Sequence, residues 1–342
     1  MYELHTDNIK RFNNIPLSVL DTSPINEGSS AGESYKNSVE VAQHVEKWGF
    51  NRYWLAEHHN MPGIGSSATS VLIGHIAGAT KRIRVGAGGI MLPNHAPLVI
   101  AEQFGTLESI YPERIDLGLG RAPGSDQATA QALRRSLHSS GEDFPEQLAE
   151  LQAYFSPDRS ARVRAVPGEG LEIPIWLLGS SGFSARLAAK EGLPFSFASH
   201  FAPAYTLPAM QLYHQNFRPS KMLKEPYAML GVNVIAAETD EEAEWLATSL
   251  QLQFLSLASG STPTKFQPPV KNMNDYWSPG QRSIVEKTLD SFSTIVGSPE
   301  TVKEKLEKFI SQTRANELII NTAVFDQKAR LRSYEILSEM MD

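Results

Sequence analysis

Short apolar segments alternate with amphipathic segments along almost the whole chain, and this alternation restricts the fold more than any other feature. Eight of the apolar segments have the length and composition of buried strands, and they begin near residues 15, 52, 83, 114, 174, 194, 227 and 317. Continuous apolar strands separated by helices are typical of a parallel sheet that is covered on its outside. Eight such units predict an α/β fold, a (β/α)8 TIM barrel with insertions, and leave a doubly wound sheet as the alternative.

Glycine, serine and proline residues predict where several helices begin or end. Gly49 and Gly192 are expected to end helices, and Ser298 followed by Pro299 has the pattern of a helix start. We expect a single barrel domain over residues 1–342. The segment Gly260–Gly280 is rich in proline and asparagine and has no periodicity, so we interpret it as a loop insertion and a candidate lid.

Composition excludes several classes of function. The net charge is −7, so phosphate backbones would be repelled on average and no nucleic-acid partner is expected. There is no cysteine, which excludes disulfides and thiolate chemistry. The polar N-terminal segment lacks a signal core, and no apolar run is long enough to span a bilayer. We therefore expect a cytoplasmic protein with no membrane partner.

Polar residues and glycines gather where the predicted strands end. They are Asp21, Glu57, His58, His59, Gly88, Gly89, Arg121, Ser180, Ser181, His200 and Asn321, with Ser184 just beyond. Simple exposure to water accounts for Asp21 and Asn321, but less well for Arg121 and the histidine pair. Because barrel enzymes carry their chemistry at the carboxyl ends of the strands, we expect a site at this rim.

The sequence Glu57-His58-His59 ends an apolar strand with three ionisable groups. Alternation places His58 with Trp54 on one face of the strand and Glu57 with His59 on the other. Three interpretations stay open: metal ligands, a structural histidine pair, and a group that handles protons. The metal interpretation lacks further ligands at fixed spacing. Buried imidazoles readily pair with carboxylates, but they also titrate near working pH.

Two glycine- and serine-rich turns are candidates for binding phosphate. The first, GLGRAPG at residues 118–124, imitates a dinucleotide fingerprint, but its third glycine is one residue late and Pro123 stands where a helix should open. The second, LLGSSGFSARLAA, places Ser180, Ser181 and Ser184 at a helix start, which suits an anion. Ordinary capping is the commoner use of serine there, although Arg121 on the neighbouring strand would favour phosphate.

Five motifs in this order resemble those of bacterial luciferase-like monooxygenases. They are WLAEHH, RVGAGGIMLPNHAP, IDLGLGRAPG, LLGSSGFSA and VGSPETVKEKL, and the likeness runs from about Ile15 to Phe325. It is strongest to the single-subunit, luciferase-alpha-like flavin-dependent oxidoreductases. The resemblance implies a barrel that binds FMN, or reduced FMN, at its carboxyl-terminal rim.

The resemblance also implies roles for individual residues. Arg121 and the serine-rich turn match the site of the flavin phosphate, which favours anion binding over a plain cap. The bond between Gly88 and Gly89 matches a non-proline cis peptide against the flavin ring. His58 matches the histidine that handles protons, and Glu57 matches a residue that touches the ring through its backbone. No metal is implied.

The activity implied by the resemblance is oxidation of a small organic substrate by reduced FMN and O₂, with an oxygen atom incorporated. A separate NAD(P)H:flavin reductase would supply the reduced flavin. Relatives of the fold use the deazaflavin F420, so F420-dependent hydride transfer is one alternative, and a non-catalytic flavin-binding protein is another. Luciferase alpha has a cysteine where this chain has Gly120, and light emission is not expected. A homodimer is compatible with the resemblance.

Overall fold

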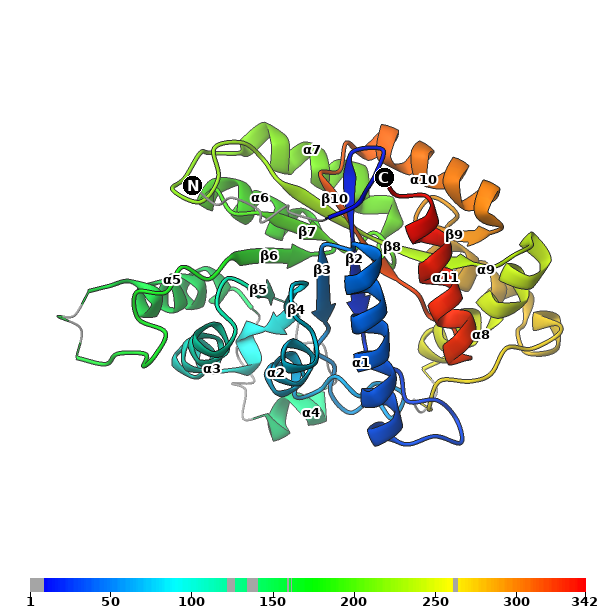
Figure 1. Cartoon of the computed structure of the whole chain (residues 1–342), viewed down its shortest axis with the longest axis horizontal. Coiled ribbons are helices and arrows are strands. Elements are labelled where there is room, and N and C mark those ends of the chain that lie inside the picture. The colour runs from blue at the N-terminus through cyan, green and yellow to red at the C-terminus, as the bar shows by residue number, and fades with distance from the viewer. Residues whose placement is uncertain (1–8, 122–126, 134–140, 159, 161, 261–263) are drawn as a thin grey trace.

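Eight parallel strands close into a barrel, as the sequence predicts (Figure 1). The computed structural model describes residues 9–121, 127–133, 141–158, 160, 162–260 and 264–342. In order round the barrel the strands are β2 (Ile15–Asp21), β3 (Arg52–Leu55), β4 (Arg84–Met91), β5 (Ile115–Gly120), β6 (Ile175–Gly179), β7 (Phe195–Phe197), β8 (Ala228–Ala236) and β10 (Glu317–Asn321). The barrel closes because β2 pairs in parallel with both β3 and β10.

Helices connect the strands, and most of them cover the outside of the barrel (Figure 1). They are α1 (Ala31–Trp48), α2 (Thr69–Ala79), α3 (Pro97–Ile110), α4 (Gln127–Ala132), α5 (Phe144–Phe155), α6 (Gly182–Glu191), α7 (Thr206–Asn216), α8 (Asp240–Ala258), α9 (Pro279–Thr288), α10 (Pro299–Thr313) and α11 (Gln327–Glu339). Gly49 ends α1 with a φ of 88°, and the Ser298 side chain caps α10. No helix in the described ranges is long and apolar enough to cross a membrane.

Two strands were not predicted from the sequence. β1 (Arg11–Phe12) pairs antiparallel with β2, and β9 (Thr294–Gly297) pairs with the later half of β8, beyond the part that pairs with β7. Both are too short to show a periodicity of their own. The Arg11 backbone also exchanges two hydrogen bonds with Asp342, which fixes the C-terminus beside β1.

Large side chains fill the interior of the barrel. The rings of Trp54 and Trp176 meet edge to face with centroids 5.2 Å apart, and Leu20, Met229 and Ile319 belong to the same cluster. Edge-to-face pairs of this kind add to the gain from burial itself. The interior below the rim is therefore packed core, and a ligand site has to lie at the rim.

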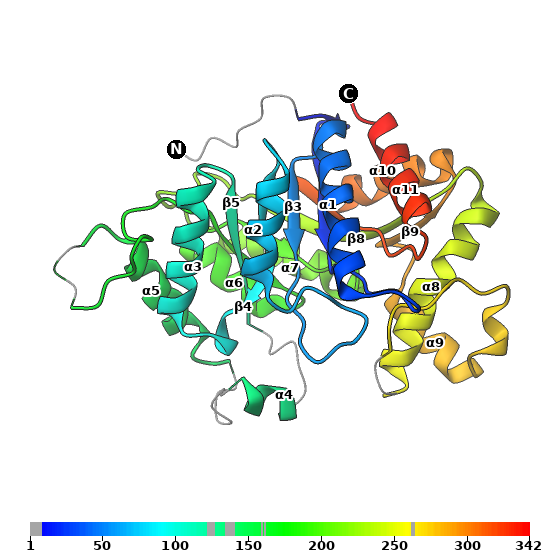
Figure 2. The same cartoon turned by 60° about the horizontal axis from the view of Figure 1, so that its bottom comes forward.

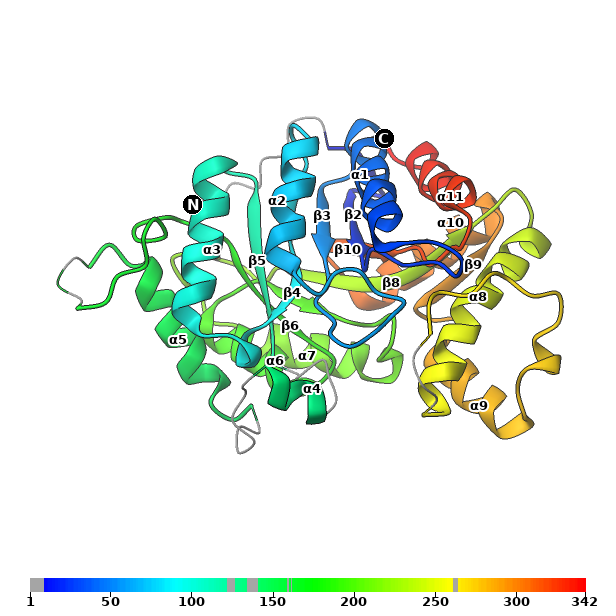
Figure 3. The ribbon, with the colours of Figure 1, turned by 90° about the horizontal axis from the view of Figure 1, so that it is seen from below.

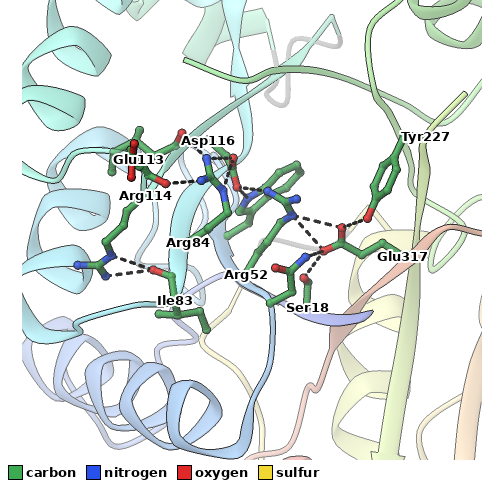
Figure 4. A network of polar contacts seen from close by, with 12 residues as sticks. Ser18, Arg52, Ile83, Arg84, Glu113, Arg114, Asp116, Tyr227 and Glu317 are labelled. Atoms are coloured by element: carbon green, nitrogen blue, oxygen red, sulfur yellow. Dashed lines mark hydrogen bonds and ion pairs between the residues drawn. The ribbon is translucent and has the colours of Figure 1, made fainter. Parts of the chain in front are cut away.

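The amino-terminal half of the barrel interior holds a buried ionic network (Figure 4). Arg52 lies between Asp116, at 2.7 Å, and Glu317, at 3.0 Å, and none of the three side chains is exposed. Arg84 forms a second ion pair with Asp116, and Tyr227 donates a hydrogen bond to Glu317. Burial alone would raise the pKa of Asp116, but the two arginines hold it below its ordinary value.

The helices α8 and α9 stand together at one side of the barrel, beyond β9 (Figures 2 and 3). In the chain between them, the backbone of Phe266 hydrogen-bonds to Ile25 and Glu27, just after β2. The Phe266 side chain is buried and stacks on Phe325. These contacts attach the segment between α8 and α9 to the carboxyl-terminal rim of the barrel.

Candidate active site

A cavity of about 680 Å³ opens at the carboxyl ends of the strands. Seven of the eight site residues expected from the sequence contact it: Glu57, His58, Gly88, Arg121, Ser180, Ser181 and Ser184. Gly89 is the exception. Residues 122–126, which include the end of the GLGRAPG motif, lie outside the described residues, as do 261–263 of the candidate lid.

One end of the cavity has the features of an anion site. The Arg121 guanidinium lies over the Phe183 ring, 4.1 Å from its centroid. Ser181 is the N-cap residue of α6, but its hydroxyl makes no capping hydrogen bond. The interpretation of this turn as an ordinary serine cap is therefore wrong. The hydroxyl and the first N–H groups of α6 stay available to a ligand.

The backbone of β4 forms part of the cavity wall. The Gly88–Gly89 peptide bond is cis, as the resemblance implies. A Cβ atom at Gly88 would lie 2.8 Å from Leu20 Cδ1, and one at Gly89 would lie 2.7 Å from the Gly118 carbonyl oxygen. The backbone of Gly118 therefore leaves no room for a side chain at position 89, whereas at position 88 the end of the Leu20 side chain would have to move. Gly88 contacts the cavity, whereas Gly89 packs against β5, where the β4–β5 register shifts.

Glu57 is the centre of a hydrogen-bonded cluster at the rim. Its carboxylate lies 2.8 Å from His59 Nε2 and 3.0 Å from His95 Nε2, and it accepts a hydrogen bond from the Met91 N–H at 3.0 Å. Burial would raise the pKa of Glu57, but these partners lower it to about 2. The cluster ties the end of β3 to the chain that follows β4. His59 thus has the surroundings of a structural, paired imidazole.

His58 contacts the cavity and takes no part in the Glu57 cluster. The residue is partly buried, and within the described ranges its buried Nδ1 has no hydrogen-bond partner. Burial lowers the pKa of His58, and the charge of Glu57 opposes that shift. A neutral imidazole with a free nitrogen can take up or give a proton. In the part of the chain that the structure describes, no three side chains are arranged to hold a metal ion.

The structure adds residues that sequence reasoning did not assign to the site. His200, Asn233 and Arg330 all contact the cavity. His200 was visible at a strand end, but its spacing from the other histidines carried no signal. Asn233 is a polar residue inside the apolar strand β8, which could have marked it.

Asp21 corrects an expectation about strand ends. We expected exposure to water to explain it, but its side chain is fully buried. It forms an ion pair with Arg330 at 2.8 Å and accepts hydrogen bonds from Ser38 and Tyr53. The pair joins α11 to β2 and compensates the charge of Arg330 at the cavity wall.

Comparison with known proteins gives the family. The profile of the luciferase-like monooxygenases matches residues 15–316. This chain belongs to that family. It is 60% identical to the uncharacterized protein YvbT of Bacillus subtilis, with 95% of this chain and 96% of that protein covered. It is 50% identical to a luciferase-like monooxygenase of Escherichia coli K12, with coverages of 96% and 97%. An N-acetyl-S-alkylcysteine monooxygenase of B. subtilis is 33% identical, with coverages of 95% and 98%.

Solved structures share the barrel. Apo-MsnO8 superposes with a TM-score of 0.89 at 35% identity, covering 95% of this chain and 98% of that one. The oxygenating constituent of 3,6-diketocamphane monooxygenase from Pseudomonas putida, in complex with FMN, has a TM-score of 0.71 at 18% identity, with coverages of 95% and 97%. An F420-dependent secondary alcohol dehydrogenase with an F420–acetone adduct has a TM-score of 0.66 at 15% identity, with coverages of 96% and 99%.

Proposed function

We propose that this family member is an FMN-dependent monooxygenase. In this proposal reduced FMN and O₂ oxidise a small organic substrate, and a separate NAD(P)H:flavin reductase supplies the reduced flavin. The observation that carries it is the arrangement at one end of the cavity. There, Arg121 lies beside the uncapped start of α6, and His58 contacts the same cavity.

The residues at the two ends of the cavity fit a flavin mononucleotide. Arg121, Ser181 and the first N–H groups of α6 would hold the phosphate, because a guanidinium and a helix N-terminus both favour an anion. Ser180 and Ser184, which also contact the cavity, would add hydroxyl donors. The ring would lie against the Gly88 backbone, where no side chain stands in the way.

The chemistry divides between cofactor and protein. When bound, reduced FMN supplies the electrons that activate O₂. His58 would accept a proton at a ring nitrogen and give it up again, because burial lowers its pKa and so favours the neutral imidazole. Glu57 would contribute backbone atoms, because its carboxylate is already occupied by His59 and His95.

The segment 260–280 would serve as a lid. Residues 260 and 264–280 of it are described, and Phe266 contacts the cavity while its backbone is fixed to the chain after β2. A lid of this kind excludes water while the substrate reacts. Because Phe266 is anchored, closing would involve the later part of the segment, where Tyr276 is 53% exposed.

F420-dependent hydride transfer is the second candidate. It is supported by the shared barrel of the F420-dependent alcohol dehydrogenase. F420 also carries a phosphate, so the Arg121 end of the cavity alone does not distinguish the two cofactors. A non-catalytic flavin-binding protein would use the same end and would not need His58.

One titration tests these candidates together. The protein and its Arg121→Ala variant are titrated separately with FMN, reduced FMN and F420, and fluorescence reports binding. We expect FMN to bind more tightly than F420, and Arg121→Ala to weaken FMN by about 10- to 100-fold, the effect of one charge-assisted hydrogen bond. Tighter binding of F420 than of FMN, or an FMN affinity that is the same in wild type and Arg121→Ala, would reject the proposal. With a flavin reductase, NADH and ¹⁸O₂, label in a product separates an oxygenase from a binding protein.

A further inference from the structure

His200 occupies a position in the barrel that mirrors that of His58. His58 lies three residues beyond the last residue of β3, Leu55, and His200 lies three residues beyond the last residue of β7, Phe197. In the closed order of eight strands, β3 and β7 are four strands apart and therefore opposite each other. Both histidines contact the same cavity. Two imidazoles thus approach the cavity from opposite walls.

The His200 ring is held in place by its neighbours. It meets the Phe201 ring edge to face, with centroids 4.8 Å apart. The His200 carbonyl accepts a hydrogen bond from Asn233 Nδ2 at 2.8 Å. Gly231 in β8 leaves the space that the ring needs, because a Cβ atom there would collide with His200 Nδ1. A ring fixed so closely is preorganised rather than adaptable.

One nitrogen of this ring is held against the backbone. His200 Nδ1 is buried beside Gly231 and makes no hydrogen bond to a side chain of the described residues. Burial, together with the nearby His58, lowers the pKa of His200 to about 4, and a hydrogen bond with the Gly231 backbone opposes that shift. The ring is therefore neutral at pH 7, and its other nitrogen is the one left for a ligand in the cavity that the ring contacts.

Much of the cavity wall is apolar, neutral polar side chains such as Asn233 and Asn321 also line it, and most of its charges are compensated. Phe254, Leu257 and Ile284 of α8 and α9 contact the cavity, together with Phe201 and Phe266. Among the described residues of the lining, two charged side chains already have partners: one has an oppositely charged group and the other has hydrogen-bond donors. Arg330 pairs with Asp21, and Glu57 is bound by two histidines. The remaining charge, Arg121, lies at the end assigned to phosphate.

We propose that His200 is a substrate-binding residue, which hydrogen-bonds the polar group of an uncharged and largely apolar substrate. This inference rests on the proposed function, because it assigns the part of the cavity that the flavin leaves free. A carboxylate or an ammonium group would lose its hydration there without gaining an opposite charge. One hydroxyl or carbonyl group would instead find a neutral imidazole among apolar side chains.

The test uses probes that share an alkyl chain and differ in the head group. Binding of 1-octanol, octanal, octanoate and octylamine is measured by calorimetry, with and without saturating FMN, on the full chain. We expect the two neutral probes to bind at least about tenfold more tightly than the two charged ones. Octanoate or octylamine binding as tightly as octanol would overturn the neutral-substrate part of the proposal.

Variants of His200 test the hydrogen bond. His200→Phe keeps a ring without polar atoms and should weaken octanol by about 3- to 10-fold, while toluene, which has no polar group, binds as before. His200→Gln keeps a donor and an acceptor and should retain most of the octanol affinity. The exposed His75, changed to Gln, is the matched control. Unchanged octanol binding by His200→Phe would overturn the role of His200. If His200→Phe does not fold, His200→Leu is measured in its place.

The FMN titration of the same samples separates this proposal from the previous one. If FMN does not bind but octanol binding still depends on His200, the flavin proposal fails and the neutral pocket stands. If FMN binding depends on Arg121, but the affinity of the probes depends neither on their head group nor on His200, only the pocket proposal fails.

Discussion

At the scale of single residues, two neighbours just beyond the end of β3 have different environments. Glu57 turns its carboxylate to His59 and His95, and its side chain is only 1% exposed. His58 contacts the cavity and leaves Nδ1 without a partner among the described residues. Both residues follow the last residue of β3, Leu55, and the difference lies in the hydrogen-bond partners that each side chain reaches.

The Glu57 cluster should make stability depend on acid pH. The folded-state pKa of about 2 lies below the ordinary 4.5, so the stabilisation is complete above about pH 4.5 and is lost as pH falls towards 2. Glu57→Gln should lower the free energy of unfolding by about 1–3 kcal/mol at pH 7. Urea unfolding at pH 7, 5, 4 and 3 checks this. The gap between wild type and variant should shrink at the lower pH values, and a constant gap would contradict it.

The two adjacent histidines should respond differently to substitution. His58→Ala should lower turnover in the reductase-coupled assay by about 10²- to 10⁴-fold with little change in stability, because a proton-handling group is lost. His59→Ala should mainly lower stability, by about 1–3 kcal/mol, because Glu57 loses a partner. Product formation and urea unfolding of both variants check this. Equal loss of turnover in the two would break the assignment.

Local patterns predicted some residues of the site and missed others for a physical reason. Arg121 and His58 stand in short motifs at strand ends, so the sequence alone could single them out. His200 could not be assigned, because its partner across the cavity comes from the opposite strand of the barrel, far away in the chain. Asp21 was misjudged because its counterion, Arg330, lies near the other end of the sequence.

At the scale of elements, the start of α6 differs from the start of α10. Ser298 accepts a hydrogen bond from the Thr301 N–H and caps α10, whereas Ser181 at the start of α6 makes no such bond. Both helices were predicted from their periodicity and end signals. Which serine caps a helix and which stays free is not visible in the sequence, because it depends on side-chain orientation.

The two serines provide a matched pair of variants. Ser298→Ala should cost about 1 kcal/mol of stability, the usual value of an N-cap, and leave FMN affinity unchanged. Ser181→Ala should cost less than about 0.5 kcal/mol, since no capping bond is lost, but should weaken FMN by about 3- to 10-fold. Urea unfolding and FMN titration of both proteins give the comparison. The opposite pattern would mean that Ser181 is a structural cap.

At the scale of the whole molecule, the two ends of the barrel hold charge in different ways. At the amino-terminal end, Arg52, Asp116 and Glu317 are fully buried and form ion pairs with one another (Figure 4). At the carboxyl-terminal rim, Arg121 and His58 contact an open cavity. This is the division expected of (β/α)8 barrels, in which one face stabilises the fold and the other carries the chemistry.

Exchanging one arginine at each end tests that division. Arg52→Met should lower the free energy of unfolding by about 3–5 kcal/mol, because Asp116 and Glu317 stay buried after losing their shared counterion. Its FMN affinity, measured well below the melting temperature, should stay within about twofold of wild type, because the network lies away from the cavity. Arg121→Ala should do the reverse, with stability changed by less than about 1 kcal/mol, the usual size of its cation–π contact with Phe183. If Arg52→Met weakened FMN as much as Arg121→Ala does, the two ends would be coupled, and the buried network would be part of the binding site rather than its support.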